Sequence, residues 1–174
     1  NMLSTLFFSL PLIDPSVLLT LPKRELISGY AEIVKHSIIN DENFFIWLDK
    51  NSKNIFNLNI KIISQAIYKS ILIKKKYVLK DEKEKLRNIF SRAILNFGHT
   101  FGHALETYYK YNKKLTHGEA ISIGMIIAAK LSYNLKYLSL GDLYKIINHF
   151  KDNKLPISDK KMKEKKIFQI IKKD

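Results

Sequence analysis

The chain has 174 residues, enough for one domain with a real core, and 46% of them are hydrophobic, which excludes an intrinsically disordered protein. It has no cysteine, which excludes disulfides and thiolate metal sites and fits the cytoplasm, and no apolar run reaches the roughly 20 residues of a membrane span. The formal net charge is +14, but the only arginines are Arg24, Arg87 and Arg92. Nucleic-acid sites rely heavily on arginine, so we interpret the charge as a lysine-rich compositional bias and expect no nucleic-acid partner.

The first 14 residues are apolar and aromatic, and residues 11–14 are predicted to form a short extended edge. Pro11 favours an extended conformation in the residue before it. Asp14 followed by Pro15 then predicts a helix start, because a carboxylate caps free backbone N–H groups and proline suits the first turn. A short helix over residues 17–21 should follow.

The next predicted helix carries residues 24–36, with an apolar stripe along one face. Glu32, Lys35 and His36 lie together on one side of it, at three- and four-residue spacing. Taken alone, this group is typical of an intrahelical ion pair that faces water.

Two further helices are predicted before the middle of the chain. Residues 44–48 are an aromatic segment that we expect in the core, and apolar periodicity continues through residues 55–80, which predicts one long helix. Residues 74–76 and 81–85 are highly charged and indicate a solvated helix end and connection.

The segment from residue 92 to residue 117 contains three of the five histidines. In one continuous helix over residues 92–106, a polar stripe would comprise Arg92, Asn96, His99 and His103. A metal or catalytic site is one reading, with His99 and His103 approaching one cation, and a polar surface stripe is the other. Gly98 and Gly102 each cost about 1 kcal/mol inside a helix, so their presence favours close packing and a site.

The remainder of the chain is also predicted to be helical. Thr116 and Glu119 have the form of a capping box, placing His117 at the mouth of a buried helix over residues 120–137. A helix over residues 143–150 and a lysine-rich last helix opening at Ser158 or Asp159 follow. The predicted fold is mainly α, a single multi-helix domain over residues 1–174 with a short extended N-terminal edge.

Three motifs occur in the chain in a characteristic order. They are LPKRE at residues 21–25 with GYAEIVK at 29–35, RAILNFGHTFGHALE at 92–106, and HGEA at 117–120 with Gly124-Met125. Together they resemble 3-dehydroquinate synthase, and the resemblance covers essentially the whole chain as the C-terminal helical domain of that family. The α/β NAD-binding domain of the family is absent, so the resemblance implies that residues 1–20 are a remnant of the junction with it.

The resemblance implies a metal bound by Glu32, His99 and His117, which replaces the pairing of His99 with His103. Two imidazoles and a carboxylate suit zinc, or cobalt. The positions that match substrate-binding residues of the family are Lys35, Lys74, Arg92, Asn96, His103 and Asn1. The positions that match a segment touching the cofactor NAD are Val17, Leu18, Leu19 and Thr20.

The implied activity is the NAD-dependent, metal-assisted conversion of a seven-carbon keto-sugar acid phosphate, DAHP, into 3-dehydroquinate with loss of phosphate. This is a step of the shikimate pathway towards chorismate and aromatic amino acids, performed in the family by a homodimer. A related sugar-phosphate cyclase and a non-catalytic basic helical binding module remain alternatives, and metal analysis separates the latter from an enzyme.

The six glycines include no G-x-G-x-x-G turn for NAD. We therefore expect that this chain cannot perform the reaction alone, and that an apolar face involving Leu6, Phe7 and Phe8 meets the missing domain.

Overall fold

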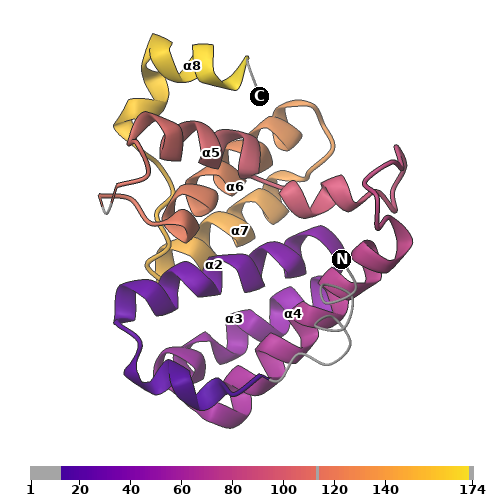
Figure 1. Cartoon of the computed structure of the whole chain (residues 1–174), viewed down its shortest axis with the longest axis vertical. Coiled ribbons are helices and arrows are strands. Elements are labelled where there is room, and N and C mark those ends of the chain that lie inside the picture. The colour runs from indigo at the N-terminus through magenta and orange to yellow at the C-terminus, as the bar shows by residue number, and fades with distance from the viewer. Residues whose placement is uncertain (1–12, 113, 173–174) are drawn as a thin grey trace, which may run out of the picture.

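The computed structural model describes residues 13–112 and 114–172, and within these ranges every regular element is a helix (Figure 1). This confirms the prediction of a mainly α fold. The elements, with η marking a 3₁₀ helix, are η1 (Pro15–Thr20), α2 (Lys23–Asn40), α3 (Glu42–Phe56), α4 (Ile60–Lys80), η2 (Arg92–Asn96), α5 (His99–Tyr108), α6 (His117–Asn134), α7 (Leu140–Asp152), η3 (Lys160–Lys163) and α8 (Lys165–Ile171). No helix in this part of the chain is long and apolar enough to cross a bilayer.

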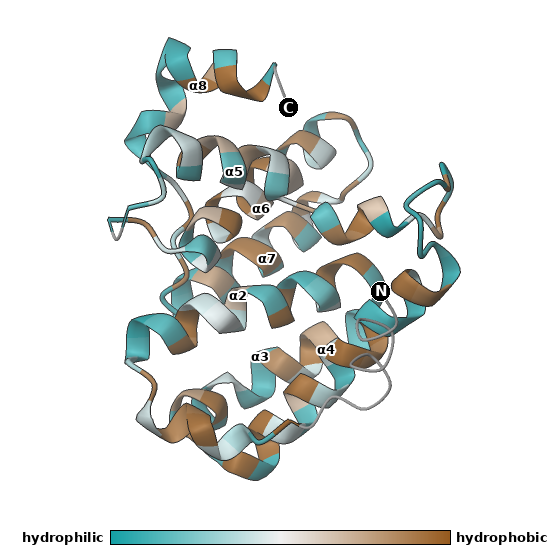
Figure 2. Cartoon of the chain, in the orientation of Figure 1, coloured by the Kyte–Doolittle hydropathy of each residue, from teal (hydrophilic) through white to brown (hydrophobic). Residues whose placement is uncertain are grey.

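Helix α2 runs through the middle of the molecule, with α3 and α4 on one side and α5, α6 and α7 on the other (Figure 1). Helix α6 is largely buried from Gly118 to Ala129, as its apolar composition predicts, and packs against α5, α2 and α7. The prediction of a buried helix as far as residue 137 is wrong, because the helix ends at Asn134 and Leu131, Leu135 and Tyr137 are exposed. Teal and brown residues alternate along α2, α3 and α4 in Figure 2, which is the pattern of helices with one face in the core. Helix α8 closes a smaller apolar cluster against α5 and α6.

The helix starts follow the predicted capping chemistry. Thr116 accepts from the backbone N–H of Glu119, whose side chain accepts in return from the N–H of Thr116, so the predicted capping box is present. Asp14 caps η1 by accepting from the N–H of Ser16, although the helix it starts is a 3₁₀ helix over Pro15–Thr20. Residues 1–12, which include Pro11 and Leu12 of the predicted extended edge, lie outside the described residues, whereas Ile13 and Asp14 are described and belong to no regular element.

The prediction of one long helix over residues 55–80 is wrong. Ile55 belongs to the last turn of α3, and α4 begins only at Ile60. Leu58 adopts a positive φ of 59°, which a continuing α-helix does not allow, and Asn59 caps the new helix by accepting from the N–H of Ile62. Apolar residues continue at helical spacing across this turn, so periodicity alone does not reveal the break.

The prediction of one continuous helix over residues 92–106 is also wrong. The segment divides into η2 and α5, and Gly98 between them has a φ of 82°, a left-handed conformation that favours glycine. Arg92 and Asn96 therefore do not continue the face of His99 and His103. The left-handed turn lets the chain change direction immediately before His99.

The glycines of this segment allow α6 to approach α5 closely, as predicted. A Cβ on Gly98 would lie 2.7 Å from the backbone nitrogen of Met125, and one on Gly102 would lie 2.6 Å from a methyl group of Ile121. On the facing helix, a Cβ on Gly124 would overlap the carbonyl oxygen of Gly98. The two helices thus meet backbone to backbone, which fixes the start of α5 relative to α6.

Candidate functional site

Glu32, His99 and His117 come together on one side of the molecule. Each offers one ligand atom, a carboxylate oxygen or an imidazole nitrogen, and these three atoms lie within 4.8 Å of one another. Glu32 lies in the interior of α2, whereas His99 and His117 are the first residues of α5 and α6. Residues from three motifs far apart in the sequence therefore converge at one point.

The carboxylate of Glu32 has two differently placed oxygens. Oε2 accepts a hydrogen bond from Lys35 Nζ at 2.7 Å. Oε1 is buried, has no hydrogen-bond partner, and lies 3.8 Å from Nε2 of His117. A buried carboxylate oxygen without a donor costs free energy unless something positive meets it. The donor set of this carboxylate and two imidazoles fits a divalent cation such as zinc.

The two imidazoles are held through their Nδ1 atoms. Nδ1 of His117 lies 3.0 Å from Oε1 of Glu106, and Nδ1 of His99 lies 3.4 Å from the carbonyl oxygen of Phe97. An imidazole that donates through Nδ1 keeps a lone pair on Nε2, which is the atom a metal needs. The orientation of both rings thus leaves Nε2 available.

The ion pair beside this site is not a solvent-facing one. Lys35 is only 3% exposed, so the interpretation of Glu32, Lys35 and His36 as a water-facing group is wrong. Burial lowers the pKa of Lys35, and its ion pair with Glu32 only partly offsets that effect. Burial alone would raise the pKa of Glu32, but the ammonium of Lys35, with smaller effects from His99 and His117, holds it below its usual value.

The electrostatic environment also favours the neutral form of His99. Burial is the largest cause that lowers the pKa of His99, and the positive charge of Lys35 adds to it. A neutral imidazole is the form that binds metals. The same charge that opposes protonation of His99 therefore leaves it ready to act as a ligand.

His103 lies one turn after His99 on α5 but outside the group of converging ligand atoms. Its ring centroid is 5.1 Å from that of His99 and 6.3 Å from that of His117. It therefore borders the three-residue group, and its predicted contact with substrate remains a prediction.

Lysine side chains border the site from α2 and α4. Lys74 is exposed on α4, and its charge is close enough to lower the pKa values of both Lys35 and His36. His36 is buried and lies 2.6 Å from Ser70 Oγ through its Nδ1. The structure thus brings Lys35 and Lys74 into one positively charged neighbourhood, whose predicted role in binding substrate remains a prediction.

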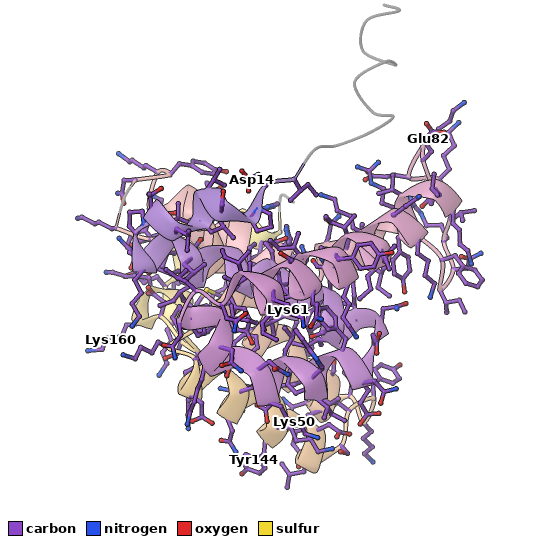
Figure 3. The ribbon with its side chains drawn as sticks, turned by 90° about the horizontal axis from the view of Figure 1, so that it is seen from below. Asp14, Lys50, Lys61, Glu82, Tyr144 and Lys160 are labelled. Carbon is purple, nitrogen blue, oxygen red and sulfur yellow. The ribbon has the colours of Figure 1, made fainter. Side chains whose placement is uncertain are left out.

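Arg92 is directed to a different part of the structure. Its Nε lies 3.0 Å from Glu84 Oε1, and its Nη1 donates to the carbonyl oxygen of Glu82 at 3.4 Å. Figure 3 shows Glu82 at the tip of the loop after α4, projecting from the helical body. Asn96, at the end of η2, is exposed. The structure does not place either residue against the three histidines.

The predicted cofactor segment forms η1. Val17 is 65% exposed and Leu19 is 50% exposed, while Leu18 packs against the core and Thr20 donates to the carbonyl oxygen of Val17. Exposed apolar side chains such as these are suited to contact with a ligand or a neighbouring domain. The predicted contact of this segment with NAD remains a prediction. Asn1, Leu6, Phe7 and Phe8 lie outside the described residues.

Sequence reasoning missed Glu106 as part of the site. Its side chain is 11% exposed and it holds His117 from a position seven residues after His99, on the same helix. The signal was the glutamate that ends the RAILNFGHTFGHALE motif. A carboxylate in an otherwise apolar turn, beside the buried Ala104 and Leu105, needs a partner.

Comparisons with known proteins agree with the three motifs. The family model described as 3-dehydroquinate synthase C-terminal matches residues 29–174. A 3-dehydroquinate synthase from Pelagibacter ubique is 47% identical over 148 residues, covering 85% of this chain and 39% of that protein. One from Buchnera aphidicola subsp. Cinara cedri is 47% identical over 145 residues, covering 83% and 38%. The chain spans about two-fifths of the length of these curated relatives.

Two solved structures share the fold. ValA, a 2-epi-5-epi-valiolone synthase from Streptomyces hygroscopicus subsp. jinggangensis 5008 with NAD+ and Zn2+ bound, has a TM-score of 0.73 at 21% identity, covering 92% of this chain and 44% of that one. A 2-deoxy-scyllo-inosose synthase complexed with carbaglucose-6-phosphate, NAD+ and Co2+ has a TM-score of 0.59 at 26% identity, covering 92% and 42%.

Proposed function

Since the chain belongs to the 3-dehydroquinate synthase family, we propose that it carries the metal centre and much of the substrate site of a 3-dehydroquinate synthase. The reaction is the NAD-dependent, metal-assisted conversion of DAHP into 3-dehydroquinate and phosphate. The observation that supports this most directly is the unpartnered, buried Oε1 of Glu32 beside His99 and His117. In this proposal these three residues bind zinc or cobalt.

A divalent cation held by Glu32, His99 and His117 would supply Lewis-acid chemistry towards the oxygen atoms of the substrate. The protein groups around it have other tasks. Lys35 holds Oε2 of Glu32, which leaves Oε1 directed towards the histidines. Lys74, on the neighbouring helix, supplies positive charge for the carboxylate or phosphate of DAHP. His103 orients a substrate hydroxyl or relays a proton beside the two ligand imidazoles.

Arg92 and Asn96 belong to the same proposal, but they need a rearrangement. Arg92 is paired with Glu84 in the loop after α4, and that ion pair is partly exposed, with side-chain exposures of 37% and 55%. Exposed pairs of this kind contribute little free energy. A phosphate or carboxylate near η2 would therefore compete effectively for the guanidinium.

The hydride chemistry of the reaction comes from NAD when it is bound. The chain has no glycine-rich phosphate-binding turn, so we propose that a nucleotide-binding domain completes the cofactor site and that η1 contributes contacts to it. We also propose a homodimer, which light scattering of the purified protein tests.

Zinc uptake tests the metal centre. Purified protein is stripped with a chelator, dialysed, and titrated with zinc against a chromophoric competitor. We expect one zinc per chain, with Glu32→Gln and His99→Ala each weakening binding strongly, whereas Glu42→Gln, at an exposed carboxylate on α3, leaves it unchanged. A wild-type protein that takes up no stoichiometric zinc would refute the proposal and favour a non-catalytic helical module.

Turnover tests the rest of the proposal. The chain is mixed with NAD, zinc and DAHP, and phosphate release is measured. We expect none from these 174 residues alone, and release when a nucleotide-binding domain of the family is supplied. Sustained turnover without that domain would overturn the assignment of the cofactor site. The ring product distinguishes 3-dehydroquinate from the product of a related sugar-phosphate cyclase.

A further inference from the structure

Glu106 is a nearly buried carboxylate whose position calls for an explanation. Its side chain is 11% exposed, and its Oε1 lies 3.0 Å from Nδ1 of His117, whose own side chain is 49% exposed. A carboxylate in this setting is stable only when it is hydrogen-bonded. Within the described residues, the ring of His117 is the partner that the structure provides.

The contact lies on the side of the ring that faces away from the predicted metal centre. Nδ1 of His117 meets Glu106, while Nε2 lies 3.8 Å from Oε1 of Glu32. Glu106 is therefore not one of the three residues that offer ligand atoms, and it contacts the ring at Nδ1, on the side opposite Glu32. An acceptor at Nδ1 selects the tautomer with a proton on Nδ1 and leaves the lone pair on Nε2.

The backbone of His117 is held independently of Glu106. The N–H of Gly118 donates to Ser28 Oγ at 3.0 Å, and Glu119 accepts from Arg24 at 2.6 and 2.7 Å. These bonds attach the start of α6 to α2. The contact with Glu106 is therefore the one that sets the rotation of the ring, separately from the position of the main chain.

The other ligand histidine has a weaker support. Nδ1 of His99 lies 3.4 Å from a neutral backbone carbonyl, that of Phe97, whereas His117 has a carboxylate at 3.0 Å. Charged acceptors form stronger hydrogen bonds than neutral ones and raise the basicity of the imidazole. The more exposed of the two histidines thus has the stronger orienting partner.

We propose that Glu106 is a positioning residue of the metal centre, which fixes the tautomer and orientation of His117 through Nδ1. The inference rests on the proposed function, because it assigns Glu106 a role towards the same cation. The inference extends the proposed metal centre by Glu106, a residue whose role requires no contact with the metal or the substrate.

Zinc affinity and ring tautomer together test this role. Glu106→Ala is compared with Glu106→Gln, which keeps an oxygen that can accept from Nδ1, and with the distant control Glu42→Gln. We expect the alanine variant to lose about 10–100-fold in zinc affinity, the glutamine variant to lose less, and the control to match wild type. Urea unfolding in EDTA establishes that each variant is folded.

The tautomer is read from the imidazole nitrogens of metal-free protein by nitrogen-15 NMR at pH 8. We expect the Nδ1–H form of His117 in wild type and in Glu106→Gln, and a shift towards the Nε2–H form in Glu106→Ala. Unchanged tautomer and zinc affinity in Glu106→Ala would overturn the inference. If wild type itself binds no zinc, the proposed function fails, while the tautomer measurement still decides whether Glu106 orients His117.

Discussion

Acid should destabilise this protein through His36, a buried histidine beside the candidate site. His36 is 6% exposed and its Nδ1 lies 2.6 Å from Ser70 Oγ on α4. Burial is the main cause that lowers the pKa of the His36 imidazole from 6.5 to about 4. The charges of Lys35 and Lys74 also lower it, and Glu32 opposes them. The folded state therefore resists protonation of this ring.

The sign and size of the change in unfolding free energy with pH follow from proton linkage. Because the pKa is lower in the folded state, the unfolded chain takes up the proton first as the pH falls. The contribution of His36 is fully present above pH 6.5 and is lost progressively towards pH 4. At about 1.4 kcal/mol per pKa unit, the interval from 6.5 to about 4 corresponds to roughly 3 kcal/mol of unfolding free energy.

Urea unfolding at pH 7.5 and pH 4.5 measures this loss, with EDTA present so that no cation alters the field at Glu32. We expect wild type to lose about 2–3 kcal/mol more than His36→Asn, in which the titrating ring is absent. Ser70→Ala is the matched control, because it removes the hydrogen-bond partner and keeps the ring. It should be less stable at both pH values with the pH dependence retained. Equal losses in wild type and His36→Asn would refute the reasoning.

Three further predictions concern the site and its supports. His103→Ala should keep zinc affinity within about twofold of wild type and lower turnover in the complete enzyme, and loss of zinc would return the ligand role to the pair His99 and His103. Gly124→Ala adds a Cβ that overlaps the carbonyl of Gly98, so urea unfolding should show a loss of about 1–3 kcal/mol or more. Gly141→Ala, where the nearest side-chain atom is 3.7 Å away, should change little. Thr116→Ala removes the cap of α6 and should cost about 1 kcal/mol in the same assay.

The sequence predicted the helical class and the buried helix well, because periodicity and capping residues are local signals. The box of Thr116 and Glu119 and the apolar run after it define α6 without any tertiary information. The break at Gly98 was missed because glycine is compatible with both a helix interior and a left-handed turn. Only the approach of α6 decides between the two conformations.

The candidate site was predicted through its motifs, and its surroundings were not. Spacing on α2 placed Lys35 beside Glu32, but the burial of Lys35 depends on the elements that pack over that face. The contact of Glu106 with His117 depends on the turn between α5 and α6, which no periodicity specifies. The pairing of Arg92 with Glu84 likewise depends on the path of an irregular loop.

The three converging residues, Glu32, His99 and His117, occupy different positions within their helices. Glu32 lies inside an 18-residue helix, whereas His99 and His117 each begin a helix. Helix ends open far more often than helix interiors, at a small fraction of the free energy of global unfolding. Here both first turns are anchored, because Gly118 and Glu119 attach the start of α6 to α2 and the backbone at Gly98 packs against α6. We therefore expect slow amide hydrogen exchange at the starts of α5 and α6 even without a bound cation.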